Sequence, residues 1–307
     1  MVDGMPATRR TDGVLLAVAV VWGSSYLTAK TATDALPVLT VLFLRHAIAA
    51  LACVPVLRGP GAPSRDERRF GGLLGLTQAA VLVLETYGVA HTSAGNAGLI
   101  ISITLVLTPV LDRAPLPGRF FLAAGVCLAG VALLVSGTGL HAPGAGDLLM
   151  LAAAMARAGH VVLVGRVTAG RSLRPLPLTA VQSVVGAVLF LGPAAPGLPA
   201  LSRTAPGTWA QLLYLALCCG LFAFLAQTWA IQRTSATRAG LLLGTEPVWA
   251  LLVGVGLGGE HLTVLAALGA ALVVTGTYWG RSIESARRSG AATTAPLSAA
   301  TDLSQAR

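Results

Sequence analysis

Four charged residues lie inside long apolar stretches of the chain: Arg45, Glu85, Arg157 and Glu246. An ionisable group near the centre of a bilayer costs about 2.5–3.5 kcal/mol on insertion scales, so each of them requires a partner, water or a function. Arginine presents a fixed fork of donors to an anionic group, and a desolvated carboxylate can bind a cation or take up a proton. Together the four charges allow a zwitterion, such as an amino acid, as the ligand.

Each of these charges also has a structural interpretation, and both interpretations stay open at this level. Glu85 either lines a substrate cavity or forms an ion pair with Arg45, and it shares with Glu246 the possible role of taking up a driving proton. Arg157 either contacts the substrate or pairs with a carboxylate such as Glu246.

Polar and aromatic residues near these charges complete the predicted substrate cavity. His160 lies three residues after Arg157 and therefore on the same helix face. Gln182 is either a cavity residue or a hydrogen-bonding contact between helices. Trp22 and Tyr26 either stack on a substrate or pack within the bundle.

Two prolines inside apolar stretches are predicted hinges. Pro247 follows Glu246 and removes a backbone hydrogen bond, as happens where an unwound helix lines a cavity. Pro109 has the comparable position earlier in the chain. The Glu246–Pro247 pair therefore serves either the ligand or the hinge.

The composition places these residues in a membrane protein. Of 307 residues, 55% are hydrophobic and only 11% are charged, and the mean hydropathy is +0.77. These values exclude a water-soluble enzyme, a disordered protein and a disulfide-rich secreted module. At roughly 20 residues per crossing, the apolar content is enough for about ten helices. The predicted spans are 13–30, 36–57, 70–90, 93–111, 119–136, 147–166, 177–191, 208–231, 236–258 and 262–280.

Basic residues are distributed unevenly between the two sides of these spans. Seventeen of the 21 Lys and Arg residues lie in tails, connections or span ends on the side of the amino terminus, and two, Lys30 and Arg203, lie on the opposite side. By the positive-inside rule, both termini of this multi-pass protein of the cell membrane are expected in the cytoplasm. The net charge of +9 follows this distribution, and no basic, aromatic-rich face indicates nucleic-acid binding.

The chain contains an internal repeat. Residues 92–94, Thr-Ser-Ala, return 142 residues later as 234–236. In the same alignment Glu85 corresponds to Gln227, which keeps the hydrogen-bonding shape without the charge. Gln227 is therefore a predicted cavity residue, and any proton or cation role belongs to one half of the chain only.

The repeat divides the chain into two units of five helices. Asp12 opens the first unit as Asp147 opens the second. Because five is odd, the second unit enters the membrane from the other side, and inverted repeats of this kind are typical of secondary transporters. The predicted organisation is a cytoplasmic tail at 1–11, repeats at 12–136 and 146–280, and a disordered cytoplasmic tail at 281–307.

Several short motifs follow one another in an order that carries a resemblance. They are residues 21–26 with Lys30, 44–45, 91–98, 146–147 with 165–166, 246–248 and 259–262. In this order the chain resembles the EamA-type proteins of the drug/metabolite transporter superfamily over about residues 12–280. The resemblance implies ten helices in two five-helix repeats, a location in the cytoplasmic membrane and movement of small metabolites, often outward. Arg157 departs from the family, where an aromatic residue is usual nearby.

No motif indicates an enzyme, a metal site or a cofactor. The four cysteines lie in apolar runs without a histidine at zinc spacing, and P-loop, HExxH and GxSxG motifs are absent from the sequence. No catalytic residue, metal or cofactor is therefore predicted, and ATP-driven transport would need another subunit. Small-xxx-small glycine pairs allow close packing within the bundle or in a homodimer.

The sequence thus predicts an all-α secondary transporter, in contact with the lipid bilayer and a small-molecule substrate. It is expected to export a small polar or amphipathic metabolite or drug by alternating access. Import, exchange and facilitated diffusion stay open. The alternatives are a membrane sensor or assembly protein with a degenerate transport fold, and a membrane-embedded lipid-modifying enzyme, which would need acidic or histidine clusters at the membrane surface.

Overall fold

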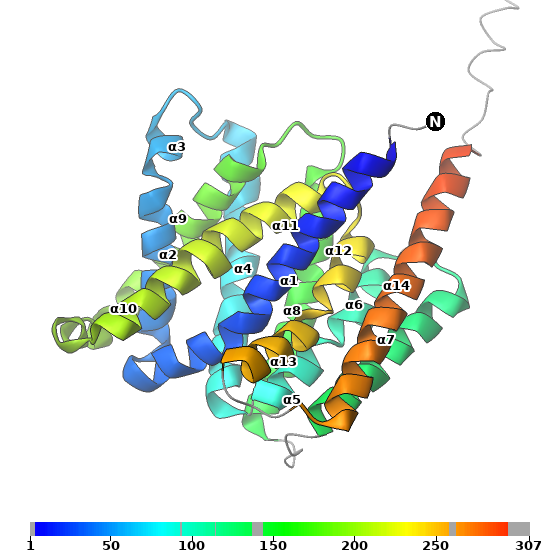
Figure 1. Ribbon diagram of the computed structural model, residues 1–307. Coiled ribbons are helices and arrows are strands. Elements are labelled where there is room, and N and C mark those ends of the chain that lie inside the picture. The colour runs from blue at the N-terminus through cyan, green and yellow to red at the C-terminus, as the bar shows by residue number, and fades with distance from the viewer. Residues whose placement is uncertain (1–3, 93, 114, 137–143, 258–261, 294–307) are drawn as a thin grey trace, which may run out of the picture.

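The computed structural model describes residues 4–92, 94–113, 115–136, 144–257 and 262–293, and every regular element in these ranges is a helix. Figure 1 shows them as one bundle. The elements are α1 (Gly4–Ala35), α2 (Val38–Ala52), α3 (Val54–Arg58), α4 (Arg65–His91), α5 (Ala94–Ile101), α6 (Thr104–Asp112), α7 (Gly118–Ser136), α8 (Ala145–Thr168), α9 (Pro175–Ala194), the 3-10 helix η1 (Ala195–Arg203), α10 (Pro206–Leu213), the π-helix η2 (Tyr214–Phe222), α11 (Ala223–Ile231), α12 (Ala236–Leu243), α13 (Glu246–Leu257) and α14 (Val264–Thr293).

Six helical segments are long and apolar enough to cross a membrane, as the composition predicts for a polytopic protein. Two shorter apolar helices, Val38–Ala52 and Gly118–Leu133, accompany them. The six segments are Arg9–Ala35, Arg65–His91, Ala145–Thr168, Pro175–Arg203, Pro206–Ile231 and Val264–Arg287.

Helices α1 and α14 extend into the two segments predicted to be tails. Helix α1 begins at Gly4, and α14 continues to Thr293. In α14 the side chains of Ile283 and Glu284 are buried, so this part of the helix is ordered by contacts that hydropathy does not reveal. Residues 294–307 of the predicted tail lie outside the described residues, as do motif residues 259–261.

The fourth and ninth predicted spans are each interrupted. The interruption at Ser102–Ile103 separates α5 from α6, and the one at Gly244–Thr245 separates α12 from α13. The two broken helices pack against each other, α6 on α12 and α5 on α13 (Figure 1). Gly244 lies so close to Leu105 that a Cβ atom there would collide with the leucine side chain. Backbone that is not helical is thus enclosed by protein, as a membrane protein requires.

A capping box and an ion pair connect the first turn of α4 to the start of α9. Ser64 caps α4 by accepting a hydrogen bond from the Glu67 amide at 3.1 Å, and Glu67 returns one by accepting from the Ser64 amide at 2.8 Å. The same carboxylate pairs with Arg174, the residue before α9, at 2.8 Å. Further along, a Cβ at Gly75 would lie only 2.8 Å from the Val185 Cβ, so the helices approach closely there.

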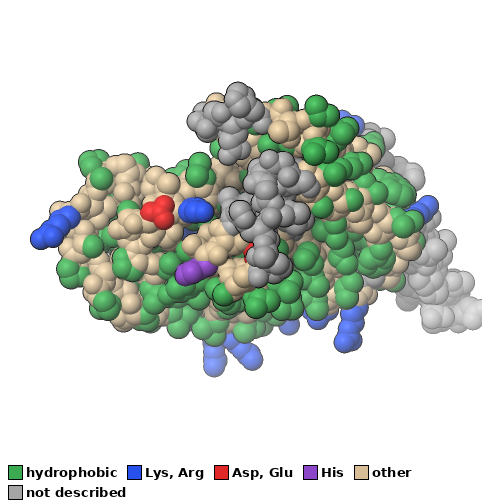
Figure 2. Space-filling model, turned by 90° about the horizontal axis from the view of Figure 1, so that it is seen from below, with side chains coloured by type: hydrophobic (Ala, Val, Ile, Leu, Met, Phe, Trp, Pro, Cys, Tyr) green, Lys and Arg blue, Asp and Glu red, His purple; other side chains and the backbone are tan. Residues whose placement is uncertain are grey.

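The two ends of the bundle can be told apart by the chain termini. The amino terminus and the last turns of α14 lie at the same end, which we call the terminal end (Figure 1). Figure 2 shows the opposite end, where hydrophobic side chains predominate and charged ones are sparse.

Candidate functional site

Arg157 lies inside the bundle on α8 and bridges two carboxylates. Its Nη1 donates to Glu246 at 2.8 Å, and its Nη2 donates to Glu85 at 2.9 Å. The side chains of Arg157, Glu85 and Glu246 are 10%, 12% and 2% exposed. These three residues, the central ion cluster, tie together α8, α4 and the first residue of α13.

Two aromatic residues of α1 complete the surroundings of this cluster. The Tyr26 hydroxyl donates to Glu246 at 2.9 Å, and the Trp22 ring centroid lies 4.7 Å from the Arg157 guanidinium carbon. Five of the predicted cavity residues are therefore neighbours. Of the open alternatives, the structure contains the Arg157–Glu246 pair, and it pairs Glu85 with Arg157 instead of with Arg45.

The charges of the central ion cluster do not balance within it. With both carboxylates ionised the cluster carries a net charge of −1, and each nitrogen at the end of the Arg157 fork faces a carboxylate. Removing one partner would leave an uncompensated buried charge, so a ligand that opens the cluster must replace the lost contact. An ammonium group can do so at a carboxylate, and a carboxylate can do so at Arg157.

Arg45 lies apart from these contacts and is held by backbone. Its Nη2 donates to the Cys219 carbonyl at 3.2 Å, and within the described chain its Nε has no hydrogen-bond partner. The indole nitrogen of Trp22 donates to the same carbonyl at 3.0 Å. Cys219 belongs to η2, and π-helical turns are rare and concentrate at functional sites. The role of this carbonyl as an acceptor could not be predicted from the sequence, because no residue type marks a π-helix.

The remaining predicted polar residues are buried around other partners. His160 contacts the Thr77 hydroxyl at 2.7 Å through Nδ1 and packs edge-on against Phe224. Gln182 and Gln227 are each 1% exposed, and among the described residues none of their amide atoms has a hydrogen-bond partner.

The two predicted hinge prolines lie differently with respect to the interruptions. Pro247 is the second residue of α13 and directly follows Glu246, just after the interruption at Gly244–Thr245. Pro109 lies inside α6, several residues beyond the interruption of its own span. The interruption in the fourth span therefore does not coincide with its proline.

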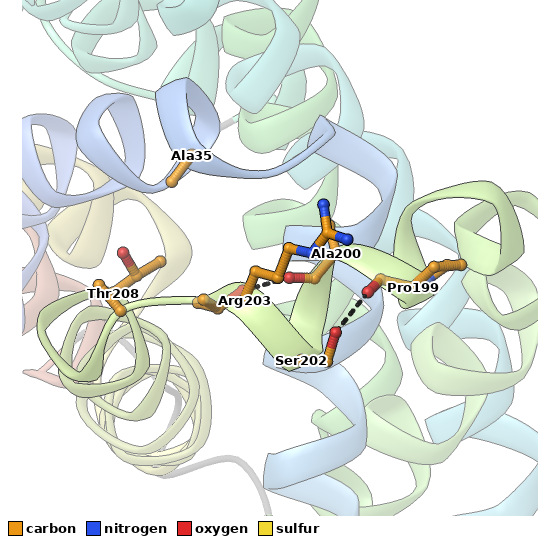
Figure 3. A pocket seen from close by; sticks show the side chains of 8 residues that line it. Ala35, Pro199, Ala200, Ser202, Arg203 and Thr208 are labelled. Carbon is orange, nitrogen blue, oxygen red and sulfur yellow. Dashed lines mark hydrogen bonds between the residues drawn. The ribbon is translucent and has the colours of Figure 1, made fainter.

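Two cavities lie near the ends of the bundle, away from the central ion cluster. At the opposite end a cavity of about 600 Å³ lies between the end of α1 and the segment from η1 to α10. Figure 3 shows Arg203 and Thr208 on its wall, with the Ser202 hydroxyl donating to the Pro199 carbonyl at 3.0 Å. At the terminal end a cavity of about 770 Å³ lies between the α8–α9 connection and the α11–α12 connection.

A buried ion network closes part of the terminal end. Arg238 donates to Asp12 at 2.7 and 2.8 Å and to Glu284 at 3.1 Å, and Arg281 donates to Asp12 at 3.0 Å. Side chains of Arg238, Asp12 and Glu284 are 4%, 6% and 0% exposed. We call these four residues the terminal ion network. The sequence places Arg238 with the basic residues on the side of the amino terminus, whereas the structure buries its side chain.

At the opposite end, Asp147, the counterpart of Asp12 in the sequence repeat, also joins segments that are distant in the chain. The Thr92 hydroxyl, between α4 and α5, donates to Asp147 in the first turn of α8 at 2.5 Å. Beside it, Gly146 packs directly on the backbone of His91, where a Cβ atom would collide. Asp12 on α1 thus contacts α12 and α14, and Asp147 on α8 contacts the turn between α4 and α5.

Comparison with known proteins decides the family. The sequence profile of the EamA-like transporter family matches residues 10–136 and 144–279. The chain belongs to this family. Its membership confirms the resemblance seen in the motifs, and it places the protein among multi-pass membrane transporters and not among enzymes.

Relatives of this EamA-like chain carry transporter names. The uncharacterized inner membrane transporter YedA of Escherichia coli (strain K12) is 28% identical over 85% of this chain and 87% of its own length. A probable terminal-alkyne amino-acid exporter of Streptantibioticus cattleyicolor is 27% identical, with coverage of 85% and 90%. A crystal structure that is only 18% identical shares the fold, with a TM-score of 0.69 over 90% of this chain and 98% of its own.

Proposed function

We propose that this EamA-like chain is a secondary exporter of a small polar or amphipathic metabolite, and that amino-acid-like zwitterions are its first candidate substrates. The central ion cluster is the observation that carries the proposal. A buried arginine between two carboxylates offers both signs of charge within one site. The relative that is named an amino-acid exporter supports the same chemical class.

The proposed architecture has ten membrane helices in two inverted repeats, with both termini in the cytoplasm. The interruptions in the second, fourth, eighth and ninth crossings account for the larger number of elements. The crossings would be α1, α2–α3, α4, α5–α6, α7, α8, α9, α10–η2–α11, α12–α13 and α14. The two family matches, at 10–136 and 144–279, support two units of this size.

In the proposed mechanism the substrate replaces internal contacts of the central ion cluster. Its ammonium group takes the place of Arg157 at Glu85 or Glu246, and its carboxylate binds Arg157 or the partly unpartnered Arg45. Because the cluster joins α4, α8 and α13, changing its contacts alters the packing of these helices and allows the halves to rock. Protonation of Glu85 or Glu246 would release Arg157 in the same way and would couple transport to protons.

Counterflow in proteoliposomes tests this proposal. Vesicles would be loaded in turn with unlabelled amino acids, with a diamine and with a dicarboxylate, and uptake of the matching labelled compound would be measured. We expect counterflow of zwitterions, and a loss of about tenfold or more in Arg157→Ala and Glu85→Gln, since each loses a charge-assisted hydrogen bond. Arg68→Ala, an exposed change in the first turns of α4, serves as the control.

Two outcomes would contradict the proposal. One is the absence of counterflow for all three classes by folded, correctly inserted protein. The other is wild-type counterflow in both variants. An imposed pH gradient in the same vesicles tests proton coupling, and coupling retained in both Glu85→Gln and Glu246→Gln would assign the proton elsewhere.

A further inference from the structure

Three buried glutamines have amide atoms without a hydrogen-bond partner among the described residues. Both amide atoms of Gln182 and of Gln227, and the amide oxygen of Gln78, have no partner within the described part of the chain. Their residues are 1%, 1% and 4% exposed. A buried amide without a partner costs roughly 2–7 kcal/mol, so each group must meet water or a ligand.

The three glutamines lie on helices that surround the same part of the interior. Helix α9 packs on both α4 and α11, and α8 packs on α4 and α11 from the other side. The Cα of Gln182 would be 3.1 Å from a Cβ at Gly75, which places it against α4 one turn before Gln78. Gln227 follows Phe224 by three residues and shares its face, which contacts His160 of α8.

These amides lie between the central ion cluster and the terminal end. On α4, Gln78 is seven residues from Glu85, about 10 Å toward that end, and on the same helix face. On α11, Gln227 is one turn below Ile231, which lines the cavity at the terminal end together with Gln232. The three glutamines therefore lie deeper in the bundle than this cavity, on the side toward the cluster.

We propose that Gln78, Gln182 and Gln227 form a second, uncharged binding position, open to water from the terminal end. It takes water and neutral hydrogen-bonding groups, because an amide both donates and accepts without a charge. In the sequence repeat Gln227 corresponds to Glu85, so the position is a neutral counterpart of the charged site. Binding of the transported molecule at this position rests on the proposed function. Access of water to the position is independent of that function.

Thiol reactivity tests the position without any known substrate. The four cysteines would be replaced by alanine, and Gln182→Cys and Gln227→Cys introduced singly into this background. The probes are two membrane-impermeant methanethiosulfonates, one anionic and one cationic, added to either side of oriented vesicles. Ala180→Cys on α9, buried, and Leu225→Cys on α11, half-buried, are the matched controls on other helix faces.

We expect both introduced thiols to react from the terminal side at least about tenfold faster than the controls, since thiol reactivity follows access to water. Both reagents should react, the anionic one faster, because Arg166, Arg171 and Arg233 line the cavity at the terminal end. Rates equal to the controls would overturn the proposal, and so would reaction from the opposite side alone. Size-exclusion profiles would confirm that each variant is folded, and Gln78→Cys would replace a cysteine variant that is not.

Discussion

The two ends of the bundle place corresponding aspartates, Asp12 and Asp147, in contacts of different kinds. At the terminal end, Asp12 pairs with Arg238 in a network of four charged residues, of which only Arg281 is partly exposed. At the opposite end, Asp147 accepts a hydrogen bond from the Thr92 hydroxyl, beside the backbone contact of Gly146. A buried charge that loses its partner is far more costly than a broken hydrogen bond to a hydroxyl. We therefore expect the contact between Thr92 and Asp147 to break more readily than the contact between Asp12 and Arg238.

The largest expected effect comes from breaking the terminal ion network. Arg238→Ala leaves Asp12 and Glu284 without their shared buried partner, and we expect it to lower the free energy of unfolding by about 3–5 kcal/mol. Unfolding in mixed micelles of mild detergent and dodecyl sulfate would measure this. The control is Arg233→Ala. Arg233 is exposed, and its guanidinium carbon lies 4.4 Å from the centroid of the Trp229 ring. An effect no larger than that of the control would mean that the network does not close this end.

A smaller effect is expected from the matching change at the opposite end. Thr92→Val keeps the shape of the side chain and removes its hydrogen bond to Asp147, which should cost about 1.5–3 kcal/mol in the same assay. Thr31→Val is the matched control, because that hydroxyl is exposed and bonds only within its own helix. If Thr92→Val were as destabilising as Arg238→Ala, the two ends would be equally closed and the comparison would fail.

The smallest expected effect comes from Arg281, the partly exposed arginine of the terminal ion network. The Arg281 side chain is 33% exposed, so Arg281→Ala should lower the free energy of unfolding by only about 0.2–1 kcal/mol. Because salt screens exposed charges, this difference should shrink at high ionic strength, whereas that of Arg238→Ala should persist. Unfolding measured at low and high sodium chloride would separate the two arginines. Equal salt dependence would show that burial does not distinguish them.

Much of the fold could be predicted because its main determinant is local. Apolar runs of membrane length appear directly in the sequence, and Pro247 marks the interrupted ninth span because proline removes a backbone donor. The interruption at Ser102–Ile103 could not be placed in this way. Beside it, Leu105 packs against Gly244 of the other interrupted span, and such a contact between distant segments leaves no local pattern in the sequence.

The members of the central ion cluster could be predicted, but their pairing could not. A charge in an apolar run is conspicuous in any sequence, and Arg157, Glu85 and Glu246 were all recognised on that ground. Which carboxylate meets which arginine depends on the rotation of each helix and on its neighbours, and both are properties of the assembled bundle. The burial of Arg238 could not be predicted for the same reason, since its partner Asp12 lies 226 residues away in the sequence.

The π-helix η2 has a consequence for the inheritance of this protein. A π-helical turn carries its residues in a wider register than the α-helix around it, so losing one codon between Tyr214 and Phe222 would restore the α-helical register. The flanking helices would keep their register, because the π-helical turn takes up about one residue more than an α-helical turn over the same angle. The carbonyl that Trp22 and Arg45 share would change its position, whereas Gln227 would stay in the interior. Loss of a single codon in this stretch is therefore a route by which a related gene could change one interior contact without rotating the rest of the crossing.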